Sequence, residues 1–189
     1  MGKSPLTEQQ VKSLRKLVAE KPLHSLLLNL SVDLMLRASD LLSLRVKDVM
    51  NESGTVKKDV KVKQKKTRKS TLFLPLSKNS IEVIKLHLTG KEPDQFIFVG
   101  QKSHYTNKPI SIIQYSRIVK KWMKMLGVEN LEKYSTHSLR KTKSSVIYKK
   151  TQSVEICRRL LGQSSVTATS AYLGIEDNDA LEVARNINI

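Results

Sequence analysis

The segment HSLRKTKSS, residues 137–145, places His137 and Arg140 three positions apart, and Tyr172 follows in TATSAYLGI, residues 167–175. A phenol oxygen can attack phosphorus and form a covalent ester. The charge that then builds on the non-bridging oxygens is stabilised by fixed arginines, and a histidine can move protons. With a second arginine and a lysine for the leaving oxygen, such a set could break and rejoin a phosphodiester with no metal or cofactor.

The spacing of the first pair suits a helix, because residues three apart lie on the same side of one. His137 and Arg140 could therefore address one phosphate from the start of a helix. Taken alone, each of these residues has a more ordinary explanation. His137 could be a structural histidine, and Tyr172 could be a half-buried aromatic side chain.

The charge balance indicates a polyanionic partner. Lys and Arg number 34 against 17 Asp and Glu, which gives a net charge of +17 and a pI of about 10.0. The densest basic segment is KKDVKVKQKKTRKS, residues 57–70, in which Val60 and Val62 alternate with lysines. A basic two-stranded ribbon can lie along phosphates or enter a DNA groove, although many such tips are simply solvated. The candidate DNA contacts in it are Lys61, Lys63, Lys65, Arg68 and Lys69.

Four segments in this order resemble the motifs of the tyrosine recombinase (phage integrase) family. The likeness runs from about residue 7 to the end of the chain. The segments are LMLRASDLLSLRVKDV (34–49), KKTRKSTLFLPLS (65–77), HSLRKTKSS (137–145) and LLGQSSVTATSAYLGI (160–175).

The resemblance implies a role for each matched residue. Arg37 and Arg140 would hold the non-bridging oxygens, and His137 would assist proton movement. Tyr172 would be the nucleophile and would form a 3′-phosphotyrosyl link that can be religated. Lys66 would protonate the leaving 5′ oxygen.

Some assignments leave alternatives open. Lys65 and Lys69 compete with Lys66 for the role of the acid, because the length of the turn is not determined by the sequence. Asp40 follows the first arginine and would brace the site. Lys141 and Lys143, beside the second arginine, are further candidates for DNA contact.

One position departs from the family pattern. Gln163 stands where the family usually has histidine. A glutamine amide can donate a hydrogen bond to a phosphate oxygen but cannot carry a proton. Gln163 is therefore counted in the candidate catalytic set, and it also favours the alternative of a non-catalytic DNA-binding protein that retains the fold. A type IB topoisomerase activity ranks lower, and an RNA-binding protein lower still.

Periodicity predicts a mixed fold, mainly α with a small antiparallel β-sheet, as in tyrosine recombinase catalytic domains. The Thr7–Gln10 and Ser111–Gln114 pairs read as capping boxes, and residues 24–36 are apolar nearly all round, which is typical of a buried helix. Alternating valines and leucines predict two strands around the basic turn. The remaining helices are expected at 79–89, 111–126, 138–150, 153–161, 165–172 and 177–186.

The organisation follows from the same patterns. We expect one catalytic domain over 1–189, without an N-terminal core-binding domain, and a tail over 173–189 that docks on a neighbour. The expected partner is double-stranded DNA, on which the chain would form a homotetramer while being a monomer in solution. The sequence has no apolar run of the ~18 residues that span a membrane, and its single cysteine, Cys157, reads as a core thiol. The expected location is the cytoplasm, at the nucleoid.

Overall fold

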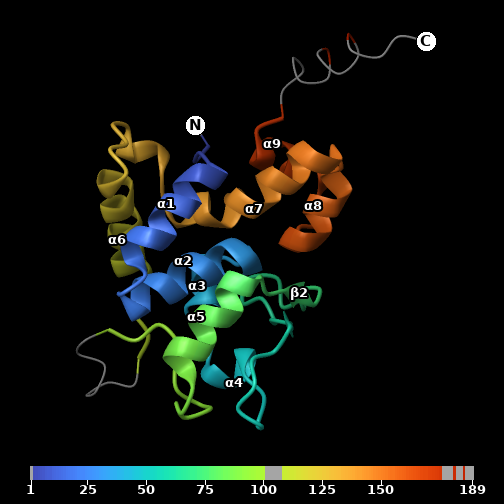
Figure 1. The fold of residues 1–189 in the computed structure, drawn as a ribbon. Coiled ribbons are helices and arrows are strands. Elements are labelled where there is room, and N and C mark those ends of the chain that lie inside the picture. The colour runs from blue at the N-terminus through green and yellow to red at the C-terminus, as the bar shows by residue number, and fades with distance from the viewer. Residues whose placement is uncertain (1, 101–107, 176–180, 182–184, 186–189) are drawn as a thin grey trace.

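Helices make up most of the chain, which we describe from a computed structural model covering residues 2–100, 108–175, 181 and 185 (Figure 1). Two short strands form an antiparallel sheet, so the predicted fold class is confirmed. The helices up to the hairpin are α1 (Glu8–Val18), α2 (Pro22–Leu34), α3 (Ala38–Leu41) and α4 (Val46–Val49). The later elements are β1 (Asp59–Val60), β2 (Leu74–Pro75), α5 (Lys78–Leu88), α6 (Ile112–Met125), η2 (Leu131–Lys133), α7 (Thr136–Thr151), α8 (Val154–Leu161) and α9 (Val166–Leu173). Within these described ranges, no helix is long and apolar enough to cross a bilayer.

Helix α2 is the centre of the core, as its apolar sequence predicted. Every residue from 25 to 34 is buried, and α2 packs against α1, α5 and α7. In Figure 1 it runs through the middle of the molecule, with α1 and α7 on one side and α5 on the other. Since burial of apolar surface is the main favourable term in folding, α2 is the element on which the others are assembled.

A buried carboxylate on α2 joins this helix to two others. Asp33 is 3% exposed, and its Oδ2 accepts hydrogen bonds from the backbone N–H of Ser77 (2.7 Å) and from Ser80 Oγ (2.5 Å). Its Oδ1 pairs with Lys143 Nζ at 3.2 Å. Burial acts to raise the pKa of Asp33, but the Lys143 charge and the hydrogen bonds outweigh it, so that the pKa lies below its usual value.

We expect Asp33→Ala to lower the free energy of unfolding by about 3–5 kcal/mol at neutral pH, because it leaves Lys143 without its buried partner. A carboxyl group whose pKa is lower in the folded state stabilises the protein above its unfolded-state pKa. That contribution is lost as the pH falls through the folded pKa, so the deficit of the variant should shrink in acid. Urea unfolding of both proteins across the acid range measures this. Glu82→Ala, at an exposed position on α5, is the matched control, and an equal effect of both substitutions would contradict the account.

The hairpin is more irregular than the alternating pattern predicted. Asp59 pairs with Pro75 and Val60 with Leu74, and beyond them only a single bridge joins Lys63 to Ser70. Leu74 and Leu76 are buried as expected, whereas Leu72 is 51% exposed. The reason is that Thr71 turns inward and bonds the backbone N–H of Val62 through its Oγ1 at 3.0 Å, which shifts the alternation by one residue.

The helices near the end of the chain agree with the predicted ones to within two residues. Ser135 caps α7, where its Oγ accepts from the backbone N–H of His137 at 3.2 Å. Gly162 ends α8 and Gly174 ends α9, both with positive φ. Cys157 is fully buried, and its Sγ contacts the Ser144 carbonyl at 3.4 Å, which confirms the core thiol. The helix expected over 177–186 lies almost wholly outside the described residues.

The segment after the first arginine forms two short helices. Helices α3 and α4 contain four residues each and are separated by the turn over residues 42–45. The Arg45 guanidinium carbon lies 4.1 Å from the centroid of the Phe96 ring. The backbones of the same two residues form an isolated antiparallel β-bridge. These contacts join the turn after α3 to the segment that follows α5.

Candidate functional site

Arg37 enters the site at the turn between α2 and α3. The chain leaves α2 through Met35, which has a φ of 48°, and Arg37 is the N-cap residue of α3. Its Nη1 donates to Gln64 Oε1 at 2.6 Å. Asp40, 1% exposed on α3, accepts from the backbone N–H of Lys65 through its Oδ1 at 2.9 Å. The first arginine motif is therefore attached to the hairpin tip at two points.

Arg140 reaches the same region from α7. It is 3% exposed, and its Nη2 donates to the Leu161 carbonyl at 2.8 Å. Its Nη1 is also buried and has no hydrogen-bond partner among the described residues. Burial lowers the pKa of Arg140, while the nearby Tyr172 phenol acts in the opposite direction and Arg37 adds to the lowering. One end of this guanidinium is thus fixed to the protein, and the other is left to bind something else.

Tyr172 lies near the Arg140 guanidinium. It is on α9, and its Oη is buried without a well-formed hydrogen bond to any described residue. Burial raises the pKa of Tyr172, and the charges of Arg140 and Arg37 oppose the rise. Lys141 Nζ lies 4.9 Å from the centroid of the tyrosine ring. The structure therefore brings the phenol together with both predicted arginines, although the three residues belong to three different elements.

His137 and Gln163 lie at the edge of this group. His137 is exposed on the first turn of α7. Partial burial lowers its pKa below 6.5, and the charges of Arg140, Arg37 and Lys141 lower it further. Gln163 follows the αL residue that ends α8, and its Oε1 accepts from Thr169 Oγ1 at 2.6 Å.

The role of Gln163 in the structure follows from that bond. Thr169 is fully buried and precedes Tyr172 by about one turn of α9. The glutamine therefore fixes the helix that carries the phenol, whatever else its amide does.

The predicted lysines of the hairpin are all at its surface. Residues 65–67 form the turn at the tip, and Lys66 is exposed there, as are Lys65 and Lys69. The structure does not bring any of these three lysines into hydrogen-bond contact with Tyr172 or Arg140. The other exposed cations of this ribbon are Lys58, Lys61, Lys63 and Arg68.

The two lysines beside Arg140 make contacts within the protein. Lys141 is 6% exposed, and its Nζ donates to the Lys3 carbonyl at 3.0 Å. Lys143 pairs with Asp33. Lys141 and Lys143 are two positions apart on α7 and therefore point in different directions, and their assignment as DNA contacts stays a prediction.

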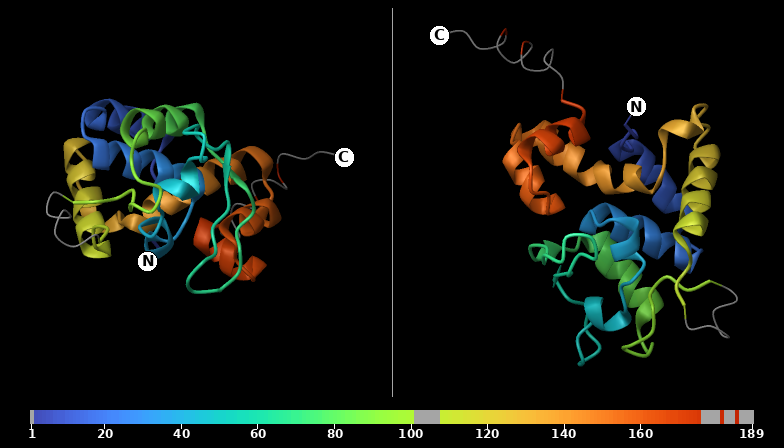
Figure 2. Two further views of the ribbon diagram at one scale, coloured as in Figure 1. Left: turned by 90° about the horizontal axis from the view of Figure 1, so that it is seen from below. Right: turned by 180° about the vertical axis from the view of Figure 1, so that it is seen from behind.

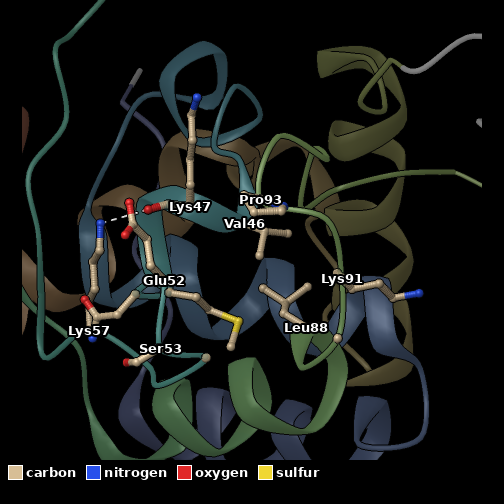
Figure 3. A pocket seen from close by; sticks show the side chains of 12 residues that line it. Val46, Lys47, Glu52, Ser53, Lys57, Leu88, Lys91 and Pro93 are labelled. Atoms are coloured by element: carbon tan, nitrogen blue, oxygen red, sulfur yellow. Dashed lines mark hydrogen bonds between the residues drawn. The ribbon is translucent and has the colours of Figure 1, made fainter.

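Two cavities lie at different distances from these residues. One, of about 380 Å³, separates the hairpin from α8 and is lined by Gln64, Thr67, Lys69, Gly162 and Gln163 among others. Seen from below, the hairpin runs beside α8 and α9 (Figure 2). A second cavity, of about 680 Å³, lies between α4, the following loop and the end of α5 (Figure 3). None of the candidate catalytic residues lines the second cavity.

One buried residue of the site was missed by the sequence analysis. Gln64 is 2% exposed and contacts both the first arginine and the end of α8. A signal was present in the sequence, because Gln64 follows Val60 and Val62 at the same spacing of two residues. Alternate residues of a strand lie on one face, so Gln64 is expected on the inward face with the two valines. A polar residue at an inward position has to find partners.

Comparisons with known proteins identify the family. The model of the "Phage integrase family" matches residues 4–179, and the chain therefore belongs to the phage integrase family of tyrosine recombinases. It is 35% identical over 143 residues to the probable integrase/recombinase YoeC of Bacillus subtilis (strain 168). The matched region makes up 76% of this chain and 72% of that protein. It is 30% identical over 155 residues to a tyrosine recombinase of Pseudothermotoga lettingae, covering 80% of this chain and 49% of the relative.

Solved structures support the same fold. The crystal structure of XerA recombinase superposes with a TM-score of 0.75 at 17% identity over 98% of this chain and 65% of the other. The XerH recombinase bound to its palindromic difH substrate gives a TM-score of 0.71 at 18% identity, over 96% of this chain and 52% of the other. This chain thus spans about half to two thirds of the length of these proteins.

Proposed function

We propose that this protein cuts and rejoins DNA at specific sites, as in integration, excision or inversion of a segment, through a covalent 3′-phosphotyrosyl intermediate. The observation that carries the proposal is the buried Tyr172 Oη, which lies close to the Arg140 guanidinium and makes no well-formed hydrogen bond to any described residue, while Nη1 of Arg140 is also buried without a well-formed partner. Two unpaired buried polar groups cost stability. A phosphate at this point would satisfy both of them.

The proposed reaction is a transesterification. Tyr172 Oη attacks the phosphorus as its proton passes to His137, whose lowered pKa leaves it neutral at pH 7. The bond from phosphorus to the 5′ oxygen breaks, and Lys66 supplies the proton to that oxygen. Arg37 and Arg140 hold the non-bridging oxygens as charge builds on them. Attack of a 5′ hydroxyl on the phosphotyrosine reverses the steps and rejoins the strand.

The proposed partner is double-stranded DNA, bound by five of the exposed cations of the hairpin. These are Lys61, Lys63, Lys65, Arg68 and Lys69. Solved relatives are described as bound to DNA, and one of them, a lambda integrase fragment, as a dimer on a core site. Assembly of this chain as a homotetramer on DNA is part of the proposal.

A non-catalytic DNA-binding protein with the same fold is the second candidate. Gln163 favours it, because its amide oxygen is occupied by Thr169 and the side chain cannot transfer a proton. The two candidates separate in one experiment with a nicked suicide DNA duplex, from which the cut fragment diffuses away. The proposed enzyme forms a protein–DNA adduct that survives denaturing electrophoresis and disappears on protease treatment, whereas the binder shifts the DNA in native gels only.

Restoring a histidine at the atypical position tests the role of Gln163. We expect Gln163→His to preserve the rate of adduct formation or to raise it, because an imidazole nitrogen can accept from Thr169 while the other donates to phosphate. Lost transition-state hydrogen bonds of this kind cost about 2.7–4 kcal/mol, which sets the upper limit of the gain. A single-turnover cleavage assay measures it. A large loss of rate would mean that the glutamine has a function of its own.

The pH dependence tests the role of His137. Because its pKa lies below 6.5, the ring is neutral at pH 7 and becomes a cation as the pH falls through that pKa. The rate of adduct formation should therefore fall on the acid side. His137→Ala should lower the rate about 10²-fold or more and remove this acid limb. The matched control is His87→Ala, because burial also lowers the pKa of His87 but this residue lies on α5, outside the candidate site. The control should keep the acid limb. An acid limb that survives in His137→Ala would contradict the assignment of His137.

A further inference from the structure

Gln64 makes side-chain contacts with three separate parts of the candidate site. Its Oε1 accepts from Arg37 Nη1 at 2.6 Å and from Thr67 Oγ1 at 3.0 Å. Its Nε2 donates to the Leu161 carbonyl at 3.4 Å. The side chain of Gln64 is 2% exposed, so its amide makes these bonds in the protein interior. A hydrogen bond is electrostatically stronger there than in water.

The Leu161 carbonyl is shared with the second arginine. It accepts from Arg140 Nη2 at 2.8 Å as well as from Gln64. The close approach of the amide to this point depends on Gly162, because a Cβ there would overlap Gln64 Nε2. Gly162 also has a φ of 62°, which favours glycine. One carbonyl at the end of α8 therefore fixes the amide and the guanidinium relative to each other.

The backbone of Gln64 closes the turn that contains Lys66. Its N–H donates to the Lys69 carbonyl, and its carbonyl accepts from the N–H of Arg68, both at 2.9 Å. Thr67, bonded to the Gln64 side chain, is the neighbour of Lys66 in this turn. The position of the turn is thus tied to the same amide that holds Arg37.

An amide is suited to this place by its chemistry. It accepts from a guanidinium and a hydroxyl at one end and donates to a carbonyl at the other, with no net charge. A carboxylate would keep the first two bonds but would face the Leu161 carbonyl with a second acceptor. An apolar side chain of the same length would lose all three bonds and leave Arg37 and the turn unattached to α8.

We propose that Gln64 is a positioning residue, which sets the Lys66 turn relative to Arg37 and Arg140 so that the leaving-group acid and the two arginines act on one phosphate. This inference rests on the proposed function. It predicts how the rate defect of a Gln64 variant depends on the leaving group. The defect in a Gln64 variant must be largest where the leaving oxygen needs a proton, because the turn carries the acid.

Two suicide substrates that differ by one atom test this prediction. One has the ordinary bridging 5′ oxygen, and the other has sulfur there. A thiol has a pKa near 8.5, so a thiolate leaves without the proton that an alkoxide needs. We expect Gln64→Met to slow adduct formation about 10- to 100-fold on the oxygen substrate and about tenfold less severely on the sulfur substrate. Gln64→Glu is expected to lie between Met and wild type on the oxygen substrate.

A smaller change keeps the test decisive if Gln64→Met fails to fold. Thr67→Val removes only the bond from the turn to Gln64 Oε1 and should slow the oxygen substrate while leaving the sulfur substrate within about twofold of wild type. Gln9→Met, at an exposed site on α1, is the matched control and should change neither. Melting temperatures of all variants are measured alongside.

The outcomes separate the inference from the function on which it rests. Equal defects on both substrates, or no defect on either, in variants that fold would overturn the positioning role of Gln64 while wild-type adduct formation upholds the proposed function. Absence of an adduct from wild type on both substrates would remove the proposed function and the inference together.

Discussion

Replacing Tyr172 by phenylalanine is expected to abolish the covalent protein–DNA adduct and to leave DNA binding unchanged. The substitution removes only the phenol oxygen, which is the proposed nucleophile. That oxygen is buried without a well-formed hydrogen bond, and the one contact that the fold loses is its weak interaction with the Arg140 guanidinium. An unpaired buried polar group costs about 1–3 kcal/mol, so the variant should be as stable as wild type or slightly more stable.

Three measurements on the same variant check this expectation. Denaturing gels report the adduct, native gels report DNA binding, and thermal unfolding reports stability. Tyr134→Phe and Tyr148→Phe are the controls, and both should form the adduct at the wild-type rate. An adduct that persists in Tyr172→Phe would show that another group attacks the phosphorus.

The second large effect is expected at Arg140. Arg140→Ala should slow adduct formation at least about 10³-fold, because it removes a fixed, buried donor from the charge that builds in the transition state. Part of the loss is structural, since the bond from Nη2 to the Leu161 carbonyl disappears too. Arg140→Lys keeps the charge but not the planar fork that binds the carbonyl and a phosphate oxygen together, so it should still be slowed about 10²-fold.

Single-turnover kinetics with saturating protein separate this loss from weaker DNA binding. Arg159→Ala is the matched control, since Arg159 is exposed on α8 and pairs with Glu155 at 2.8 Å. It should cleave at close to the wild-type rate. An Arg140→Ala protein that is folded and cleaves within tenfold of wild type would exclude the guanidinium from the reaction.

Much of the fold could be predicted because its signals are local. The capping boxes at Thr7 and Ser111 are present as expected, with both reciprocal bonds formed. The residues of α2 are apolar around the whole helix, and a helix of that kind has to be buried. The strands were predicted less well, because the inward turn of Thr71 depends on what the hairpin packs against and not on its own alternation.

The sequence motifs named candidate members of the site, whose roles stay a prediction, but they did not give the arrangement of these residues. The motifs pointed to Arg37, Arg140 and Tyr172, and the structure brings these residues together. The burial of Lys141 and the contacts of Gln64 were not predictable, since they join residues 138 and 97 positions apart in the sequence. Such contacts exist only after α7 and α8 have packed, and no local pattern reports them.

The most direct test of the central claim is to locate the DNA on the protein. Trypsin should release Tyr172 in the peptide from Leu160 to Arg185, which contains no other tyrosine. After wild-type protein has reacted with a suicide substrate and the DNA has been trimmed with nuclease, mass spectrometry should find this peptide carrying a nucleotide on Tyr172. A nucleotide on a peptide with Tyr134 or Tyr148, or no modified peptide from a protein that binds the substrate, would contradict the account.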